Sequence, residues 1–392
     1  MNKLLYISTG IPREEADRLR QKQVDFSSNA LLPITVFHGN VLAGLAEQYD
    51  EVCALSGVPI NHKNFRILRY SGRKMQNGKI QYVIPGFFNL PGVKQLTVTV
   101  KLWAFIRRWC RKNRGHNCHI LLDGTFYTGL LALAAGKTGD VKTGAILVDY
   151  YSFMDPERKT RSQRNYYRLL KQIDKFIFVT EHLEKLVNED HKKYMIMEGL
   201  VNAQYETDTQ PPVGNHCVYA GGLHEIYGVK NLVDAFRESD LPYELHLYGN
   251  GSLVDYIREA GEQDKRIVYG GILPHEELLR LEREAKLLVN PRPVHGQLDT
   301  RFNFPSKLME YMQSGRPVIT TRLLGIPAEY QGRMYFFDGD SKEQLREKLE
   351  QILALPEAEL CRFGKAARTY VNENKNQAAV GKRIFDLMDS EG

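Results

Sequence analysis

The sequence predicts an α/β protein with two domains of similar size, each a mainly parallel sheet covered by helices on both faces. Short apolar runs alternate with amphipathic stretches along the whole chain, which is the pattern of repeated strand–helix units. The alternation breaks once, in the polar segment NAQYETDTQPPVGN (202–215), and then restarts. A chain of 392 residues is long enough for two domains.

In the first half, short apolar runs predict strands, and longer stretches with helical spacing of apolar residues predict helices. The predicted strands are Leu4–Ser8, Glu51–Ser56, Phe65–Tyr70, Ile80–Pro85, His119–Asp123, Gly144–Asp149 and Phe176–Thr180. The predicted helices are Ile34–Gln48, Gln95–Lys112, Thr128–Gly136, Gln163–Ile173 and Glu181–Glu189.

The second half repeats this pattern. Its predicted strands are Cys217–Ala220, Tyr243–Tyr248, Arg266–Gly270, Lys286–Asn290, Pro317–Thr321 and Tyr335–Phe337. Its predicted helices are Val229–Glu238, Leu253–Ala260, His275–Glu284, Ser306–Gln313, Lys342–Leu353, Glu357–Val371 and Asn376–Met388. We therefore expect Rossmann-like domains over 1–203 and 204–375, with a C-terminal helix (376–392) that packs back toward the first. Such sheets bind ligands outside the carboxyl ends of their strands, so the site is expected in the cleft between the domains.

Composition and charge exclude several classes of protein. The chain is 43% hydrophobic and 26% charged, which excludes a disordered or fibrous protein. The five cysteines are far apart and form no CxxC pair, which favours a reducing, cytoplasmic setting. No apolar run approaches the ~18 residues of a membrane span. Residues 1–200 carry a net charge of +12 and the remainder −6, so the first half is expected to meet an anionic partner.

The segment NPRPVHGQLDTRFNFPSKLMEYMQSGRPVITT (290–321) is the most informative. Pro305 suits the first turn of a helix, and unpaired N–H groups at a helix start suit a phosphate. Lys307 opposes the helix dipole there, which an anionic ligand would explain. Glu310 lies one turn beyond Ser306 and is placed to accept hydrogen bonds from a ribose diol. In the alternative interpretation, Ser306 only caps the helix and Glu310 is a solvated carboxylate.

The piece FNFPSKLMEYMQSGRPVI resembles the donor-binding segment of family-four-type (group 1) glycosyltransferases of the GT-B fold, especially bacterial enzymes of capsule and lipopolysaccharide synthesis. The segments VYAGGLHEIYGVKNLVDAF, LHLYGNGSLVDYI and YGGILPHEELLRLEREAKLLVNPRP resemble further parts of that family's second domain, in the same order. The first half resembles the family only through DGTFYTGLLALAAG and AILVDYY.

The resemblance implies roles for individual residues. Glu310 would hold the donor ribose, and the turn from Phe304 through Pro305 and Ser306 to Lys307 would contact the diphosphate. Ile272 and Leu273 would meet the nucleobase through their backbone. Gly221 and Gly222 would let the backbone approach the phosphates, because glycine has no Cβ.

Three positions depart from the family pattern. Phe302 stands where the family usually has a second glutamate, eight residues before the ribose glutamate. Gly222 and Tyr227 stand where many members have arginine and lysine. Arg292, Arg301 and Lys307 are candidates to replace that cationic clamp, since arginine suits diphosphate oxygens. Asp299 or Asn303 would then contact the donor sugar.

In the first half, Asp149 at a strand end is the candidate beside the reacting centre, and Asp123 competes with it. Both have the alternative of a cap or loop ligand, which aspartate favours. Gly10 either lets the main chain approach the donor phosphate or simply forms a turn. His119, His182 and His275 receive no chemical role.

Two further motifs have structural alternatives. KLWAFIRRWCRKNR (101–114) is a basic amphipathic helix whose Leu102, Phe105, Ile106 and Trp109 face is expected to pack on the sheet, while its arginines suit anionic lipid. Asp338-Gly339-Asp340 matches a DxD metal pattern but is interpreted as a turn and cap. No metal and no other cofactor is expected.

The residues and this resemblance together predict a cytoplasmic glycosyltransferase that moves a sugar from a nucleoside diphosphate to a hydroxyl of a lipid-linked or saccharide acceptor. The resemblance implies that the reaction retains the configuration of the sugar. It is expected to contact the inner face of the cell membrane through its basic half and to bind no nucleic acid. The alternative is a catalytically silent relative that supports a partner enzyme, which the departures at Phe302, Gly222 and Tyr227 would explain. The sequence argues against a dehydrogenase, because STGIPREE, and not GxGxxG, follows the first strand.

Overall fold

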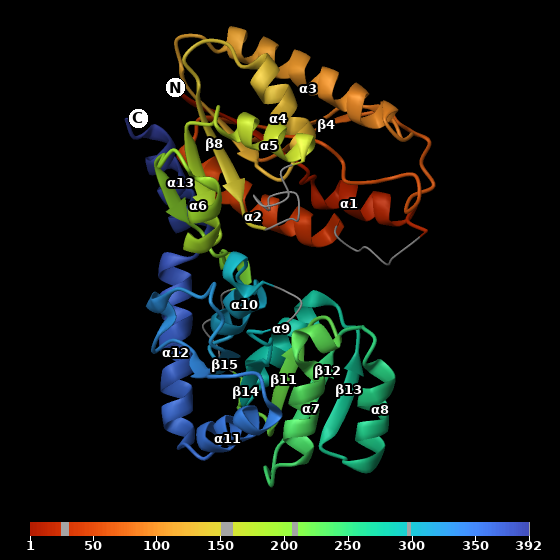
Figure 1. Cartoon of the computed structure of the whole chain (residues 1–392), viewed down its shortest axis with the longest axis vertical. Helices are drawn as coiled ribbons and strands as arrows, with labels where there is room; N and C mark the ends of the chain where they lie inside the picture. The colour runs from red at the N-terminus through yellow and green to blue at the C-terminus, as the bar shows by residue number, and fades with distance from the viewer. Residues whose placement is uncertain (25–30, 150–159, 206–210, 296–298, 392) are drawn as a thin grey trace. The chain divides into compact units, whose positions relative to one another are not determined.

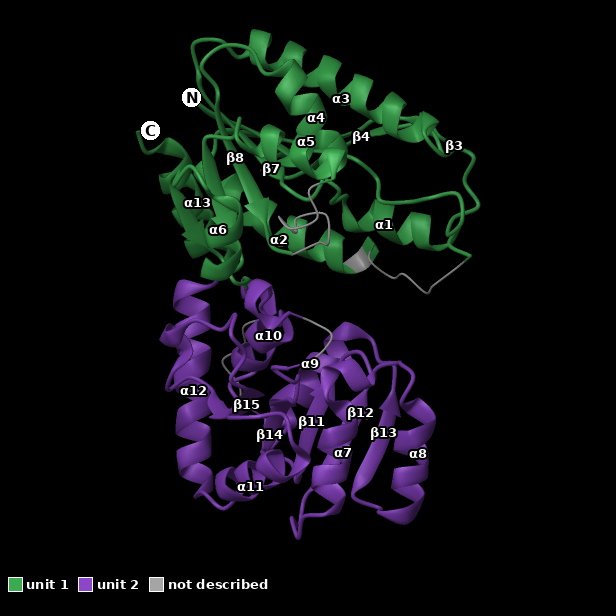
Figure 2. Cartoon of the chain, viewed as in Figure 1, with its two compact units in different colours: residues 1–200, 377–392 green, residues 201–376 purple. Residues whose placement is uncertain are grey.

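The computed structural model describes every residue except 25–30, 150–159, 206–210, 296–298 and 392. The chain divides into two compact units (Figure 2): unit 1 contains residues 1–200 and 377–392, and unit 2 contains residues 201–376. Part of the predicted linker, 206–210, lies outside the described residues. Each unit contains a mainly parallel sheet with helices packed on it (Figure 1), so the predicted α/β fold is confirmed.

The sheet of unit 1 has the strand order β10-β9-β8-β7-β1-β2-β5-β4, and β4 is antiparallel to its neighbour β5. Its strands are β1 (Asn2–Ser8), β2 (Glu51–Ser56), β4 (Arg73–Asn77), β5 (Ile80–Ile84), β7 (Asn117–Asp123), β8 (Lys142–Leu147), β9 (Lys175–Phe178) and β10 (Tyr194–Ile196). The central strands are apolar on both faces because helices cover both sides of a parallel sheet.

The predicted strand at Phe65–Tyr70 is wrong over most of its length. Only β3 (Arg69–Tyr70) is extended, and it pairs with β6 (Phe87–Phe88) in a separate two-stranded ladder. Phe65 is buried in a turn, where its N–H donates to the carbonyl of Asn61. Its hydrophobic side chain therefore serves the core without needing a strand.

The helices of unit 1 include one from the far end of the chain. They are α1 (Arg13–Arg20), α2 (Leu31–Gln48), α3 (Val93–Lys112), α4 (Tyr127–Gly136), α5 (Arg161–Leu170), α6 (Glu181–Val187) and α13 (Gln377–Asp389). The C-terminal α13 packs along α2 (Figure 1). A Cβ on Gly381 of α13 would lie 2.3 Å from backbone atoms of Gly44 in α2, so the two glycines allow the helix backbones to touch.

Helix α3 buries one stripe and exposes another. Val98, Leu102, Ile106 and Cys110 are buried. Leu102 and Ile106 belong to the predicted apolar face, whose other members, Phe105 and Trp109, are half-buried. Among the described residues, no helix has the length and apolar character needed to cross a bilayer.

The sheet of unit 2 is parallel throughout, with the strand order β13-β12-β11-β14-β15-β16. Its strands are β11 (His216–Ala220), β12 (Glu244–Tyr248), β13 (Ile267–Gly271), β14 (Leu287–Asn290), β15 (Val318–Thr321) and β16 (Tyr335–Phe337). Its helices are α7 (Val229–Arg237), α8 (Val254–Gln263), α9 (His275–Glu284), α10 (Lys307–Gln313), α11 (Lys342–Leu353) and α12 (Glu357–Asn374). Strands β11 to β13 follow one another toward one edge of the sheet, and β14 to β16 follow one another toward the other edge. The direction in which strands are added therefore reverses between β11 and β14.

Candidate functional site

The candidate site lies at the carboxyl edge of the unit 2 sheet, where the strand order reverses between β11 and β14. Gly221 and Gly222 follow β11 directly, and Arg292 follows β14 after a single proline. Ligands of open parallel sheets bind at such a switch point. Residues predicted from separate parts of the sequence therefore meet at one edge.

Lys307, the first residue of α10, reaches the loop after β11. Its Nζ lies 4.0 Å from the ring centroid of Tyr219, the geometry of a cation–π contact. A Cβ on Gly221 would lie 2.5 Å from that Nζ, and Gly221 has φ +147°, so only glycine fits beside the ammonium. Burial, followed by the charge of Arg292, lowers the pKa of Lys307 to about 7. An anion beside this group would stabilise its charged form.

Arg292 is the second cation at this edge. Its Nη1 donates to Oδ1 of Asn303 at 2.9 Å, and its guanidinium carbon lies 5.2 Å from the ring centroid of Tyr227. The Tyr227 ring in turn covers Gly222, where a Cβ would lie 2.7 Å from the ring. The tyrosine that departs from the family pattern thus supports the arginine, and Arg292 and Lys307 supply positive charge from different elements.

Arg301 is engaged elsewhere. Its guanidinium forms an ion pair with Asp299, with Nη2 to Oδ2 at 2.7 Å, and lies over the ring of Phe302. Asp299 also accepts a hydrogen bond from the backbone N–H of Arg301. These two residues therefore stabilise the short 300–302 turn, where Phe302 is buried.

Glu310 has a partner that the sequence analysis overlooked. Its Oε2 accepts a hydrogen bond from Nε2 of His275, the first residue of α9, at 2.6 Å. The His275 ring also contacts Tyr205 edge-on, with centroids 5.5 Å apart. The interpretation of His275 as a helix-start residue without chemistry is incomplete, because it orients the predicted ribose-binding carboxylate. No sequence pattern links the two residues, which are 35 positions apart.

The turn before α10 combines buried and exposed residues. Phe304 and Pro305 are buried, and the Phe304 ring packs on Tyr330 with centroids 5.3 Å apart. Ser306 is exposed and makes no capping hydrogen bond, so its interpretation as a side-chain cap is wrong. Because α10 has only seven residues, positive potential here comes mainly from Lys307 and Arg292 rather than from the helix dipole.

Ile272 and Leu273 follow β13 at the same edge of the sheet. Ile272 is 72% exposed, which is unusual for so large an apolar side chain, and Leu273 is half-buried. Gly271 turns the chain before them, with φ +74°. Their placement after a strand end fits a loop available to a ligand.

The remaining predicted residues belong to unit 1. Strand β8 ends at Leu147, so Asp149 lies two residues beyond the strand and is exposed. Asp123 is buried at the end of β7, where Oδ2 lies 3.3 Å from Nε2 of His38, and its pKa is lowered by hydrogen bonds from His38 and Thr125 that outweigh its burial.

Gly10 also contacts His38. A Cβ on Gly10 would lie 2.4 Å from Cβ of His38, so His38 occupies the space that the missing side chain leaves. The absence of a side chain at Gly10 therefore serves internal packing, and the proposed approach of a phosphate to this glycine is not needed to explain it.

The two aspartates of the DxD-like segment, Asp338 and Asp340, interact with an arginine and with backbone N–H groups. Asp340 accepts hydrogen bonds from the backbone N–H groups of Val294 and His295, at 2.5 and 2.8 Å, and Asp338 pairs with Arg322. The helix cap predicted here is provided instead by Ser341, which forms a capping box with Gln344. Within the described ranges, no group of three or more His, Cys, Asp or Glu side chains is arranged to hold a metal.

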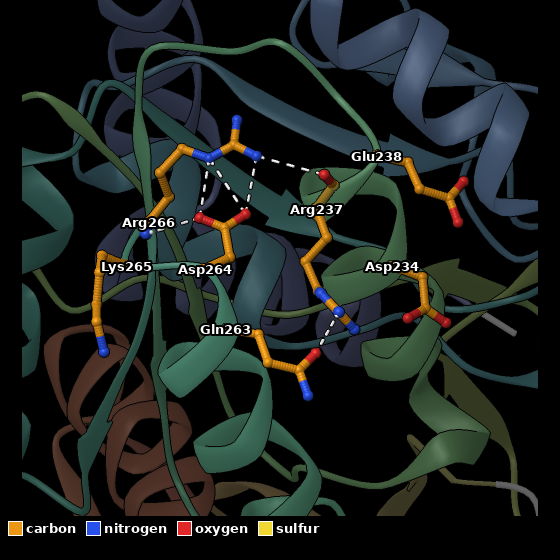
Figure 3. Close-up of a pocket in the computed structure, with 7 residues that line it drawn as sticks. All are labelled: Asp234, Arg237, Glu238, Gln263, Asp264, Lys265 and Arg266. Atoms are coloured by element: carbon orange, nitrogen blue, oxygen red, sulfur yellow. Dashed lines mark hydrogen bonds and ion pairs between the residues drawn. The ribbon is translucent and has the colours of Figure 1, made fainter.

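A cavity of about 510 Å³ lies away from this edge, near the amino end of β13 (Figure 3). Arg266 there faces Asp264 and donates to the carbonyls of Ser239 and Leu241, while Arg237 donates to Gln263. These polar groups satisfy one another and join the ends of α7 and α8. We regard this cavity as structural.

Comparison with known proteins agrees with the geometry of unit 2. Residues 214–354 match the family model of glycosyl transferases group 1. The match covers β11 to α11 and thus includes Gly221, Arg292, Lys307 and Glu310. No curated protein matches the sequence at a significant level.

Solved structures resemble the chain over nearly its whole length. Sucrose-phosphate synthase from Thermosynechococcus elongatus has a TM-score of 0.65 and 14% identity, covering 99% of this chain and 98% of that chain. HepE from Anabaena in complex with UDP has a TM-score of 0.64 and 14% identity, covering all of both chains. The lipopolysaccharide outer core galactosyltransferase WaaB has a TM-score of 0.61 and 12% identity, covering 98% and 99%. The chain therefore has the GT-B fold of these proteins, and its residues 214–354 form a domain of the glycosyl transferases group 1 family.

Proposed function

We propose that unit 2 binds the diphosphate of a nucleoside diphosphate sugar between Lys307 and Arg292, and that the chain transfers the sugar to an acceptor hydroxyl with retention of configuration. One observation carries the proposal. Two half-buried cations stand at the switch point against aromatic faces, and among the described residues neither is bonded to a carboxylate. Unpaired buried charge is costly, so a bound anion is the natural reason for it.

The chemistry follows from these charges. As the bond between sugar and diphosphate breaks, negative charge grows on the leaving diphosphate, and Lys307 and Arg292 stabilise it. Glu310, oriented by His275, accepts hydrogen bonds from the ribose hydroxyls. Asn303, which accepts a hydrogen bond from Arg292, is our candidate for a contact with the donor sugar. Phosphate charge is met by these side chains without a metal ion, so we expect turnover to survive a chelator.

The base of the donor is proposed to be uracil. The structurally similar HepE binds UDP in one crystal structure, and a second HepE structure, with a TM-score of 0.61, is a complex with UDP-glucose. The exposed Ile272 and half-buried Leu273 are where we expect the base to lie.

Unit 1 is proposed to bind the acceptor. It has a cavity of about 640 Å³ lined by Tyr127 and one face of α5, with the lining residues Arg161, Ser162, Arg164, Asn165 and Arg168. Three arginines in one cavity suit a phosphate-bearing acceptor, such as a lipid-linked saccharide. Asp149, near the carboxyl end of β8, remains our candidate for a polar group beside the reacting centre.

Helix α3 is proposed to contact anionic lipid from the cytoplasmic side. Val93, Leu96, Val100 and Trp103 are exposed and follow one another at helical spacing, with Leu96 69% exposed. Lys101 and Arg108 add exposed positive charge on the same helix. Apolar side chains beside lysine and arginine are typical of helices that lie in the membrane interface.

The experiment for α3 compares co-sedimentation with phosphatidylglycerol vesicles and with neutral phosphatidylcholine vesicles. We expect binding to the anionic vesicles alone, and its loss in Leu96→Glu/Val100→Glu. Equal binding by the double variant would show that this surface is not used.

The experiment for the donor site is calorimetric titration with UDP-glucose and the corresponding guanosine, adenosine and thymidine diphosphate sugars, followed by product analysis. Binding and turnover with one donor, both weakened in Glu310→Ala, are expected. Donor binding without transfer or hydrolysis would instead favour a silent subunit. Unchanged affinity in a folded Glu310→Ala variant would remove the ribose role.

A further inference from the structure

Glu282 is a carboxyl group buried beside the candidate site with nothing to bind it. It is 0% exposed, and neither of its oxygens has a hydrogen-bond partner in the part of the chain that the structure describes. An ionised carboxylate without partners is too costly to bury, so the group must be held in its neutral form. Burial and the nearby charge of Glu310 raise the pKa of Glu282 well above its usual value.

The position of Glu282 connects it to the donor residues. It lies seven residues after His275 in α9, so the two side chains share one face of the helix, two turns apart. His275 fixes this face to α10 through Glu310 at 2.6 Å. If it were ionised, Glu282 would raise the pKa of Lys307 and of the buried Tyr311, both in α10, so its side chain faces that helix.

The titratable and charged groups around Glu282 and Lys307 come from several elements. They are Glu310, Lys307 and Tyr311 from α10, Arg283 from α9, and Arg292 from the loop after β14. Tyr219 of β11 covers the ammonium of Lys307. None of the hydrogen bonds among the described residues joins Glu282 to Lys307, so the carboxyl does not capture the ammonium.

We propose that Glu282 is a positioning residue of the donor site: held un-ionised between α9 and α10, it leaves the positive charge of Lys307 available to the donor diphosphate, and its ionisation in alkaline solution cancels that charge. This inference rests on the proposed donor site. Lys307 also loses its proton as pH rises. The site that binds the diphosphate therefore carries two protons, one on Lys307 and one on Glu282.

The sign of the pH effect follows. Below neutrality both protons are present, and the affinity for a diphosphate is greatest. As pH rises, the site loses the ammonium charge of Lys307 and gains the negative charge of Glu282. Each proton that binding must restore lowers affinity by up to about tenfold per pH unit, so two protons give up to about a hundredfold.

The test measures the dissociation constant of UDP-glucose by calorimetry from pH 6 to pH 9.5, with wild type, Glu282→Gln and Glu282→Met. Both replacements are uncharged and of similar length, and the methionine leaves no polar atom to bury. Thermal denaturation of each variant establishes that it is folded. At pH 6 we expect both variants to bind within about twofold of wild type, because Glu282 is already neutral there.

In alkaline solution the limiting slope of log Kd against pH should fall from two protons in wild type to one in either variant. Lys307→Met should keep the single proton that belongs to Glu282. Profiles of equal slope in wild type and both Glu282 variants would overturn the inference, as would a loss of affinity at pH 6 in both.

The outcomes separate this inference from the proposed function. If wild type does not bind UDP-glucose or any of the other donors, the donor site itself is wrong. If Lys307→Met loses affinity at pH 6 but the Glu282 variants keep the wild-type slope, the donor site stands and only the role of Glu282 fails.

Discussion

Replacing Lys307 by methionine tests the charge at the proposed donor site most directly. Methionine keeps the length and much of the apolar stem of lysine, so the packing against Tyr219 is retained while the ammonium is removed. A hydrogen bond that involves a charged group contributes about 1.5–3 kcal/mol, which corresponds to a loss of about tenfold to a hundredfold in affinity for UDP-glucose. This full loss is expected at pH 6, where the ammonium is present.

The same variant predicts a pH dependence. Since burial and Arg292 lower the pKa of Lys307 to about 7, the free protein has largely lost the proton by pH 8. Binding must then restore the proton, which costs about 1.4 kcal/mol at pH 8. The ratio of dissociation constants between Lys307→Met and wild type should therefore shrink about tenfold from pH 6 to pH 8. The diphosphate of UDP-glucose does not titrate in this range.

Calorimetric titration at both pH values checks these numbers, with Lys265→Met as the control. Lys265 is an exposed lysine of the same unit that lines the cavity in Figure 3, away from the carboxyl edge. The reasoning is refuted if folded Lys307→Met binds UDP-glucose as tightly as wild type at pH 6. A ratio that does not change with pH would show that Lys307 keeps its proton throughout.

Three further predictions concern neighbouring and distant packing. Gly221→Ala places a Cβ 2.5 Å from Nζ of Lys307 and should weaken UDP-glucose binding by calorimetry. Gly332→Ala, which is also at a positive φ (+78°) but has no atom within 4 Å of the added Cβ, should leave binding unchanged. His275→Ala removes the hydrogen bond to Glu310 and should raise the Kd of UDP-glucose less than Glu310→Ala does. The control is His246→Ala, which breaks a similar pair with Glu244. An equal effect of the two histidine variants on the Kd would contradict the role of His275. Gly381→Val forces α13 away from α2 and should lower the free energy of unfolding, measured by urea denaturation, by about 1–3 kcal/mol. The control Lys382→Ala, at the exposed neighbouring residue, should lower it by less than about 1 kcal/mol. Equal denaturation midpoints for the two variants would show that the packing of α13 on α2 does not depend on this contact.

Much of the fold was predictable because each strand and helix has a local cause. The helix His275–Glu284 has the predicted bounds, and most buried strands were located to within a few residues. The elements missed either lack an apolar pattern or are very short, as β6 (Phe87–Phe88) and β10 (Tyr194–Ile196) are. β4 (Arg73–Asn77) is a polar edge strand, and α1 (Arg13–Arg20) is mostly charged, with Ala16 and Leu19 buried. A hairpin sign, Asn77-Gly78, was present between β4 and β5.

The candidate site was predictable only in part. Gly221, Arg292 and Lys307 were identified by position in motifs, and the structure brings them to one edge of the sheet. The pairing of Glu310 with His275 was not predictable, because 35 residues separate them and both are common surface residue types. Arg301, predicted as a third cation, pairs with Asp299 two residues away.

By itself, the sequence determined the alternation of strands and helices and the residue types at each strand end, because these depend on local periodicity and backbone preference. Only the tertiary structure decided which of those residues meet. The strand order of unit 2 sets Lys307 against Tyr219 and Gly221, and the packing of α9 buries Glu282 while leaving His275 at the surface. Helical periodicity places two residues on one face, but the charge that a buried side chain carries depends on what packs against that face.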